Sequence, residues 1–460
     1  MQEDGNRCVL ESLNTHRSRI RTPYVPLTGS HWLTSCALVV LPYLAAITII
    51  GKGPTYLGIF PVFWAEAVLA ISVLSVLMAG GWSVVFLREW RSLSSLVVAF
   101  MGLGLIHLQD DVRVFGLDAI RDSSLWYYSA FYFVGLVVGY DAQVGESVWR
   151  WVSRFWVMAL IWGSCEFLSG ERLSQMGPEV PLRGVPVLSH SGSDLMQNMS
   201  MGMIVVFGLR YPVSNRLARV VCLIAGIICL IALVTFHGRG AKLAVVSGVL
   251  MGCLFLVSPR GAPAISRRLG TLLLTTVVML TLGFLIAPED VLRASHVDRL
   301  YEISLDEPLG TTRWRVDWWV ELVNAVAADN AAFGLGFGES LSIYSPYLTQ
   351  DEYSSWPVRS PHNYSMAVFA RMGVVGLFLW LCILLIGLSG LIKDVWRGEA
   401  SPRREQSSLW IIMLLITVVN GSFGVLMDGP VLGIWFWFAL GFATVRSRMN
   451  GTPNACPSVA

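Results

Sequence analysis

Residues 372–392 read MGVVGLFLWLCILLIGLSGLI, a stretch of 21 residues without a charged side chain. An α-helix needs about 20 apolar residues to cross the hydrocarbon core of a bilayer. Similar stretches recur along the 460-residue chain, which is 54% hydrophobic and only 14% charged. A soluble domain is typically about a quarter charged. The composition therefore predicts a membrane protein with many spans, and it excludes a disordered, collagenous or nucleic-acid-binding chain.

Twelve apolar stretches have the character of transmembrane helices. They lie at 31–50, 57–79, 92–108, 123–140, 151–169, 194–209, 217–236, 241–258, 269–287, 363–392, 408–427 and 430–446. Because each is close to the length of one helical span, the sequence predicts an all-α polytopic membrane protein with about 12 transmembrane helices.

The basic residues indicate the orientation of these helices. If the N-terminus is inside, the inner segments hold 20 of the 33 Lys and Arg residues and the outer segments hold 12. Every short inner loop is then basic, as the positive-inside rule requires. We therefore predict that both terminal segments, 1–30 and 447–460, are cytoplasmic.

One outer segment, 288–362, is long enough to fold over the membrane, and within it 312–329 has the pattern of a helix. Trp314, Trp318 and Trp319 lie on one apolar stripe of that helix. The stripe fits either a helix at the membrane interface or a helix packed on the loop's own core. The glycine-rich run 334–338 then predicts a turn in which the backbone approaches another group closely.

A short outer hairpin, 237–242, is the first candidate binding site. His237, Arg239 and Lys242 place cations between two strongly apolar stretches, and Gly238 and Gly240 permit an unusual backbone there. Cations at a helix N-terminus on the membrane surface suit a phosphate group. The alternative is that these side chains extend to lipid headgroups.

A second group of candidates lies in the long outer loop. Arg313 and Arg315 begin the predicted loop helix, where they suit an anion or pair with the loop's many carboxylates. His362, followed by Asn363, stands at the start of a span. A neutral imidazole there suits a general base near pH 7, and the alternative is a hydrogen-bonding histidine at the interface.

The sequence lacks several motifs that would indicate other chemistry. It contains no DxD, GxSxG, P-loop or HExxH pattern, and no Cys/His spacing typical of a metal site. We therefore predict no metal and no cofactor. Few ionisable residues fall within the spans, most clearly Glu66, Glu166 and Arg371, which disfavours an ion-coupled transporter.

In their order along the chain and in the side of the membrane on which they are predicted to lie, these segments resemble the O-antigen ligase family. The core domain of that family is shared with many bacterial polysaccharide polymerases. The resemblance covers 217–446, including the outer loop 288–362, whereas 31–216 matches only in topology. It rests on His237-Gly238-Arg239-Gly240, on Arg313 or Arg315 with Trp318, Gly334, Gly336 and Gly338, on His362-Asn363 with Gly373 and Gly376, and on the hairpin 420–435.

The resemblance implies a glycosyltransferase in the bacterial inner membrane with its active site facing the periplasm. The family's donor is a glycan linked to undecaprenyl diphosphate, and the reaction is metal-independent and inverting. In a ligase the acceptor is lipid A–core, and in a polymerase it is a growing glycan. Transfer to a protein hydroxyl is a third variant, and a flippase for lipid-linked glycans is the rival of another class.

The resemblance also implies a role for each candidate residue. Arg239 and Arg313 would bind the diphosphate, with Arg315 as the alternative to Arg313, and His362 would take the acceptor's proton. The remaining residues would line the diphosphate and glycan site: Lys242, His237, Gly238, Gly240, Asn363, Trp318 and Gly336.

Overall fold

The computed structural model describes most of the chain outside the termini and two long segments around 248–310 and 347–359. The described ranges are 27, 29–59, 62–170, 172–180, 185–188, 190, 192–208, 216–235, 242–247, 311–346, 360–397, 402–424 and 427–449. Within them the protein is mostly helical, with two short two-stranded antiparallel ribbons. This agrees with the all-α prediction.

The elements of the first half begin with α2. They are α2 (Ser30–Ile49), η1 (Gly53–Tyr56), β1 (Gly58–Ile59), β2 (Val62–Phe63), α3 (Trp64–Met78), α4 (Trp82–Val85), α5 (Arg91–Phe115), α6 (Leu117–Asp122), α7 (Ser124–Tyr127), η2 (Tyr128–Ala130), α8 (Phe131–Tyr140), α9 (Ala142–Ser169), α10 (Arg172–Met176), β3 (Glu179–Val180), β4 (Val185–Pro186), α11 (Gly192–Met203) and η3 (Ile204–Gly208).

The elements of the second half complete the bundle and add a helix outside it. They are α12 (Arg216–Thr235), α17 (Thr311–Asp329), η4 (Leu341–Tyr344), α19 (Tyr364–Arg397), α20 (Pro402–Gly421) and α21 (Leu432–Met449). Residues 242–247 are also helical.

Four described helices are long and apolar enough to cross a membrane: α2, α5, α12 and α19. Helices α3 and α20 are apolar but shorter. The stretch 269–287 and most of 241–258 lie outside the described residues. The chain is therefore a membrane protein, while the number of spans and their orientation stay predictions.

The predicted stretch 123–140 is not one continuous helix. It consists of α7, the 3-10 turn η2 and α8. The tight turns at its start place Ser124 and Leu125 against the second half of the chain. The Ser124 Oγ donates to the Asp428 carbonyl (2.8 Å), and the Leu125 carbonyl accepts from the Tyr364 hydroxyl (2.7 Å).

Helices α8 and α21 form the closest-packed part of the bundle. A Cβ on Gly135 would collide with the Phe438 carbonyl, and one on Gly441 would collide with the Tyr132 carbonyl. Small residues that bring helix backbones together are typical of interfaces between membrane helices, where van der Waals contact drives association.

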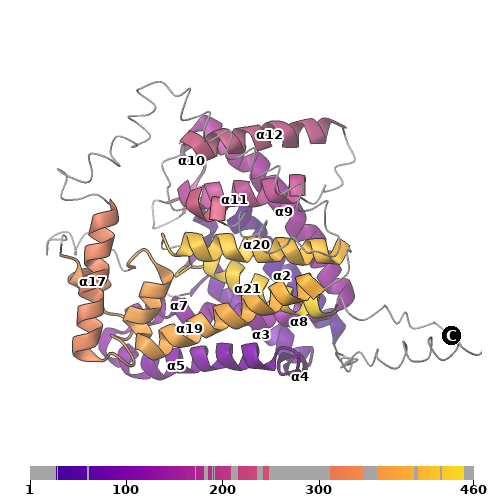
Figure 1. Cartoon of the computed structure of the whole chain (residues 1–460). Coiled ribbons are helices and arrows are strands. Elements are labelled where there is room, and N and C mark those ends of the chain that lie inside the picture. The colour runs from indigo at the N-terminus through magenta and orange to yellow at the C-terminus, as the bar shows by residue number, and fades with distance from the viewer. Residues whose placement is uncertain are drawn as a thin grey trace, which may run out of the picture.

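Helix α17 differs in direction from the long helices. It runs across one end of α5 and α19, whereas α19 lies between α5 and α20 and packs against both (Figure 1). Its boundaries agree with the predicted helix 312–329. Trp318, Leu322 and Val326 are fully buried against Leu341 and Ala370. The stripe that they form therefore packs on the protein's own core, which is the second of the two alternatives above.

Candidate functional site

Three segments that are distant in sequence meet at the end of the bundle beside α17. They are the first turns of α17, residues 360–363 before α19, and the hairpin between α20 and α21. Arg315 Nη1 donates to the Phe423 carbonyl (2.9 Å), and Trp319 Nε1 donates to the Pro361 carbonyl (2.8 Å). The Ser360 hydroxyl donates to Asp428 Oδ2. The three segments thus hold one another in place through hydrogen bonds.

His362 stands at a turn where the chain enters α19. Its φ of 57° is the only positive φ at a non-glycine residue in the described part of the chain. Such a backbone is uncommon outside glycine and is frequent at functional sites. The next residue, Asn363, caps the helix, because its Oδ1 accepts from the Met366 N–H (3.2 Å). The cap and the turn together fix the position of the imidazole.

The surroundings of His362 keep its imidazole neutral. Its ring packs edge-on against Trp314, with 5.7 Å between ring centroids. Burial, and to a smaller extent the charge of Arg315, lowers the pKa of His362 to about 4. A cation and a neutral imidazole are therefore neighbours here, and the imidazole can accept a proton at neutral pH.

Arg315 is a half-buried cation whose hydrogen-bonding groups are only partly used. Burial lowers the pKa of its guanidinium. Its Nε is enclosed and has no hydrogen-bond partner among the described residues, although Nη1 is bonded to Phe423. Because the guanidinium as a whole is only half-buried and its hydrogen-bonding capacity is not exhausted, it is a favourable partner for a phosphate oxygen.

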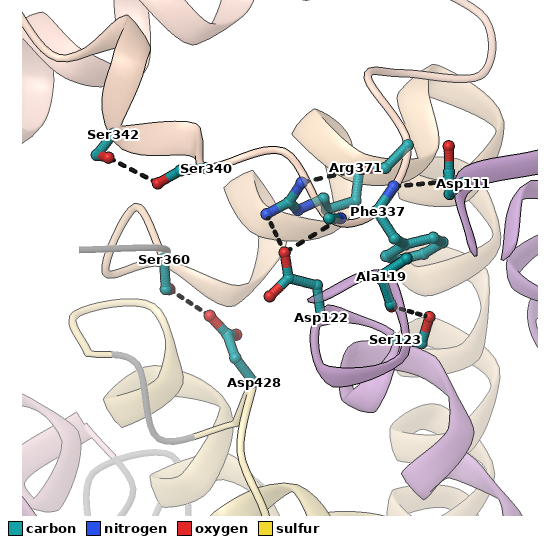
Figure 2. Close-up of polar contacts among 12 residues, drawn as sticks. Asp111, Ala119, Asp122, Ser123, Phe337, Ser340, Ser342, Ser360, Arg371 and Asp428 are labelled. Atoms are coloured by element: carbon teal, nitrogen blue, oxygen red, sulfur yellow. Dashed lines mark hydrogen bonds and ion pairs between the residues drawn. The ribbon is translucent and has the colours of Figure 1, made fainter. Parts of the chain in front are cut away.

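Asp428 was not assigned a role from the sequence, although it belongs to the hairpin 420–435 that carried part of the resemblance. Its Oδ1 is enclosed and has no partner among the described residues. Burial raises the pKa of Asp428 to about 7, and the hydrogen bond from Ser360 and the charge of Arg371 oppose that rise. Figure 2 shows its carboxylate near Asp122 and Arg371. A carboxyl group with this pKa suits proton transfer near neutral pH.

Three of the predicted site residues have structural roles in this region. Trp318 is fully buried and donates from Nε1 to the Leu341 carbonyl (3.0 Å). Gly336 lies against Asp111, whose Oδ1 would be 2.7 Å from an added Cβ. Asn363 caps α19. The close backbone approach predicted for the glycine-rich run is therefore an approach to the protein's own carboxylate, and contact of these residues with a substrate stays a prediction.

The other predicted site residues lie wholly or partly outside the described part of the chain. This holds for His237, Gly238, Arg239 and Gly240, and for the side chain of Arg313. Lys242 is partly buried at the start of the helical residues 242–247. The described residues therefore bring together Arg315 and His362, but they do not place the hairpin.

The acidic and imidazole groups of this region are not arranged as a metal site. Within the ranges given above, no group of three or more His, Cys, Asp or Glu side chains is placed to hold a metal ion. Two described cations lie in this region: Arg371 is paired with Asp122, whereas the Arg315 guanidinium has an unused donor.

Part of the chain matches a known family. Residues 224–381 match the O-antigen ligase family. The matched segment begins in α12, contains α17 and His362, and ends within α19 before the hairpin that holds Asp428. No curated protein matches the chain. The family implies glycan processing of the ligase or polymerase type on lipid-linked glycan and acceptor substrates.

Proposed function

Because the chain carries an O-antigen ligase domain at residues 224–381, we propose that it transfers a glycan from undecaprenyl diphosphate to an acceptor hydroxyl at the periplasmic face of the inner membrane. We favour a ligase, with lipid A–core as the acceptor. A polymerase that extends a growing glycan on the same donor is the alternative. The observation that carries the proposal is the position of Arg315 beside His362 and the hairpin of Asp428.

The departing diphosphate determines what the site must provide. As the bond from the anomeric carbon to the diphosphate oxygen breaks, its electron pair and negative charge pass to the phosphate. Fixed cations that contact this oxygen stabilise the transition state more than the bound donor. We assign this role to Arg315 and Arg239, with Arg313 as the alternative to Arg315 and Lys242 as a further contact. Guanidinium groups then take the place of a metal ion.

The acceptor hydroxyl must lose its proton as its oxygen attacks the anomeric carbon. Attack opposite to the leaving diphosphate inverts the configuration. His362 is neutral at pH 7 and is the base that the resemblance implies, but a pKa of about 4 makes it a weak one. Asp428 is the second candidate, because its pKa of about 7 gives a stronger base that is still partly ionised at neutral pH.

The rival function is movement of a lipid-linked glycan across the membrane. A transporter would place its cations around a central cavity at the middle of the membrane. Arg315 instead belongs to α17, and His362 packs against Trp314 of the same helix. Helix α17 crosses one end of the long helices (Figure 1). That position at the end of the bundle favours chemistry at the membrane surface.

The test is transfer by the purified protein, with a defined lipid-linked donor and candidate acceptors in EDTA. A new glycoside and released undecaprenyl diphosphate are expected. Transport across liposomes without glycoside formation would overturn the proposal, and a requirement for divalent metal would overturn the role of the arginines. In cells lacking the gene, long glycan on the lipid carrier indicates a ligase, and single repeat units indicate a polymerase.

A further inference from the structure

Helix α19 is broken at Gly373 inside its apolar part. Gly373 has φ 62° and ψ −162°, a conformation open to glycine and costly for other residues. A break of this kind leaves backbone N–H and C=O groups without partners in the helix. In a membrane helix such groups must be satisfied by other parts of the protein.

The chain that follows α17 inserts into this break and satisfies those groups. The N–H groups of Val374 and Val375 donate to the carbonyls of Ala331 and Ala332, at 3.0 and 3.1 Å. In the other direction, Leu335 N–H donates to the Ala370 carbonyl (2.8 Å), and Gly336 N–H donates to the Arg371 carbonyl (3.1 Å). The inserted segment, residues 331–336, thus bridges the two parts of α19 through backbone hydrogen bonds.

Charged side chains fasten the inserted segment and the residues after it to three helices. Arg371, which is 4% exposed, donates to the Gly336 carbonyl (3.0 Å) and to Asp122 Oδ2 (2.8 Å). The same Asp122 oxygen accepts from Gly338 N–H (3.2 Å), and Asp111 Oδ2 accepts from Phe337 N–H (2.7 Å). Figure 2 shows these groups converging from α5, α6 and α19 on the segment 334–338.

We propose that the Asp122–Arg371 pair is a positioning site, which locks the segment 331–338 into the break of α19 and thereby sets the position of α17. The link to α17 is direct. The helix ends at Asp329, and the Asn330 carbonyl and Oδ1 accept from the N–H groups of Gly334 (2.7 Å) and Phe333 (3.2 Å). The locked segment is therefore continuous with the C-terminus of the helix that carries Arg315.

The same pair also acts on Asp428, and this consequence rests on the proposed function. Tyr364 and Arg371 of α19, and Asp122 of α6, are the titratable and charged groups that interact with Asp428, which also accepts from Ser360. The Arg371 charge lowers the pKa of Asp428, and the Asp122 charge raises it. The pair thus holds α17 in place and contributes two opposing charges beside the hairpin of the site.

The lock is tested without substrate, by hydrogen–deuterium exchange of the purified protein in nanodiscs. Asp122→Asn keeps the shape of the side chain but removes the carboxylate charge that pairs with Arg371, and Arg371→Gln removes the cation that pairs with the buried Asp122. Breaking a buried pair by removing one partner is strongly destabilising, so we expect peptides covering 330–340 and 370–377 to exchange about 100-fold faster. The double variant should exchange no faster than the worse single variant, because both charges are then gone.

Asp110→Asn is the matched control. Asp110 also lies near the end of α5 and pairs with Arg113 at 3.7 Å, but both side chains are more than four-fifths exposed, at 87% and 81%. Exposed pairs contribute little to stability, so its exchange should equal that of the wild type. Unchanged exchange at 330–340 in both Asp122→Asn and Arg371→Gln would overturn the lock. Equal acceleration throughout α8 and α21 would also overturn it, because it would indicate general unfolding.

A second experiment measures the pH dependence of glycan transfer. It distinguishes an effect of the Asp122–Arg371 pair on Asp428 from a general loss of structure. If Asp428 is the base, activity falls as the pH drops through its pKa. Arg371→Gln should move that midpoint upward, and Asp122→Asn should move it downward, whereas a general defect would lower the rate without opposite shifts. Shifts in the same direction would overturn the electrostatic role. Failure of the wild type to transfer glycan would refute the proposed function, while the exchange experiment would still decide the lock.

Discussion

The α8–α21 interface and the junction between α17 and α19 hold the molecule together by different means. At the first, small residues let two helix backbones touch through apolar contact, and collisions with a Cβ at Gly135 or Gly441 show how close they are. At the second, a broken helix receives an inserted backbone, fastened by Asp111, Asp122 and Arg371. The first interface depends on shape, whereas the second depends on charge. The candidate site lies beside the second, so its chemistry and its support share the same charges.

The largest effect is expected from removing the base beside the polar junction, since general bases contribute about 10²–10⁴-fold. A base works only when deprotonated. If Asp428 is the base, wild-type activity falls as the pH drops through about 7. Asp428→Asn then abolishes the activity, and with it the fall at acidic pH. If His362 is the base, activity stays level down to about pH 5, because its pKa is about 4, and His362→Ala abolishes it. The pH profile of kcat/KM for the three proteins decides between them.

The next largest effect is expected at the cation. Arg315→Ala should lower kcat/KM by about 10²–10³-fold, the usual cost of losing one donor to a developing oxyanion. Arg315→Lys should recover only part of this loss, because a point charge does not replace two guanidinium contacts. Arg239→Ala should have an effect similar to that of Arg315→Ala. Steady-state kinetics with varied donor would measure these losses, with the exposed Arg113→Ala as the control.

Arg313→Ala offers a direct contrast with Arg315→Ala. Positions two apart on an α-helix project from nearly opposite sides, so we expect only one of these arginines to serve the site. The hydrogen bond of Arg315 to Phe423 and its charge beside His362 favour Arg315. A large loss with Arg313→Ala and normal kinetics with Arg315→Ala would reverse this assignment.

Local patterns were enough to predict α17 and α19, but not the turns that divide the predicted stretch 123–140 into α7, η2 and α8. The bounds of α17 differ by one residue from the predicted 312–329, because an apolar stripe at helical spacing and the following glycines are both read within the segment. The start of α19 beside His362 was predicted because the apolar stretch 363–392 begins there. Arg315 and His362 were candidates because a cation and an imidazole at the ends of outer helices are visible in the sequence alone.

The support of the site could not be predicted from such patterns. Asp122 and Arg371 are 249 positions apart, and Asp428 and Ser360 are 68 apart. Nothing in the sequence around Asp122 distinguishes it from other carboxylates in loops. The break at Gly373 was also hidden, because glycine is frequent in membrane helices and the stretch 372–392 that contains it carries no charged side chain. Only the fold shows that Asp122 pairs with the buried Arg371 and that residues 331–336 fill the break in α19.

A smaller effect, on stability rather than chemistry, is expected at the apolar interface. Gly441→Val places side-chain atoms where the Tyr132 carbonyl now lies, and such overpacking costs about 1–3 kcal/mol. Thermal unfolding in detergent should show the loss, while the pH profile of the folded fraction should keep its midpoint. A displaced midpoint would indicate that the two regions are coupled, and the contrast between them would fail.

The smallest effect is expected from Trp318→Phe, which sharpens the contrast within α17 itself. Trp318 is fully buried and donates to the Leu341 carbonyl (3.0 Å). Phenylalanine keeps most of the apolar contact but leaves that carbonyl without its donor, at a cost of about 1 kcal/mol. If Trp318 only packs, thermal stability falls slightly and the KM for the donor is unchanged. If it also contacts the glycan, as the resemblance implies, KM rises in addition to the same small loss of stability. Trp314→Phe is the matched comparison, because Trp314 lies on the same stripe, donates to the Ser345 hydroxyl (3.2 Å) and packs against His362. A larger change in KM for Trp314→Phe than for Trp318→Phe would place the boundary between scaffold and site within this one turn of α17.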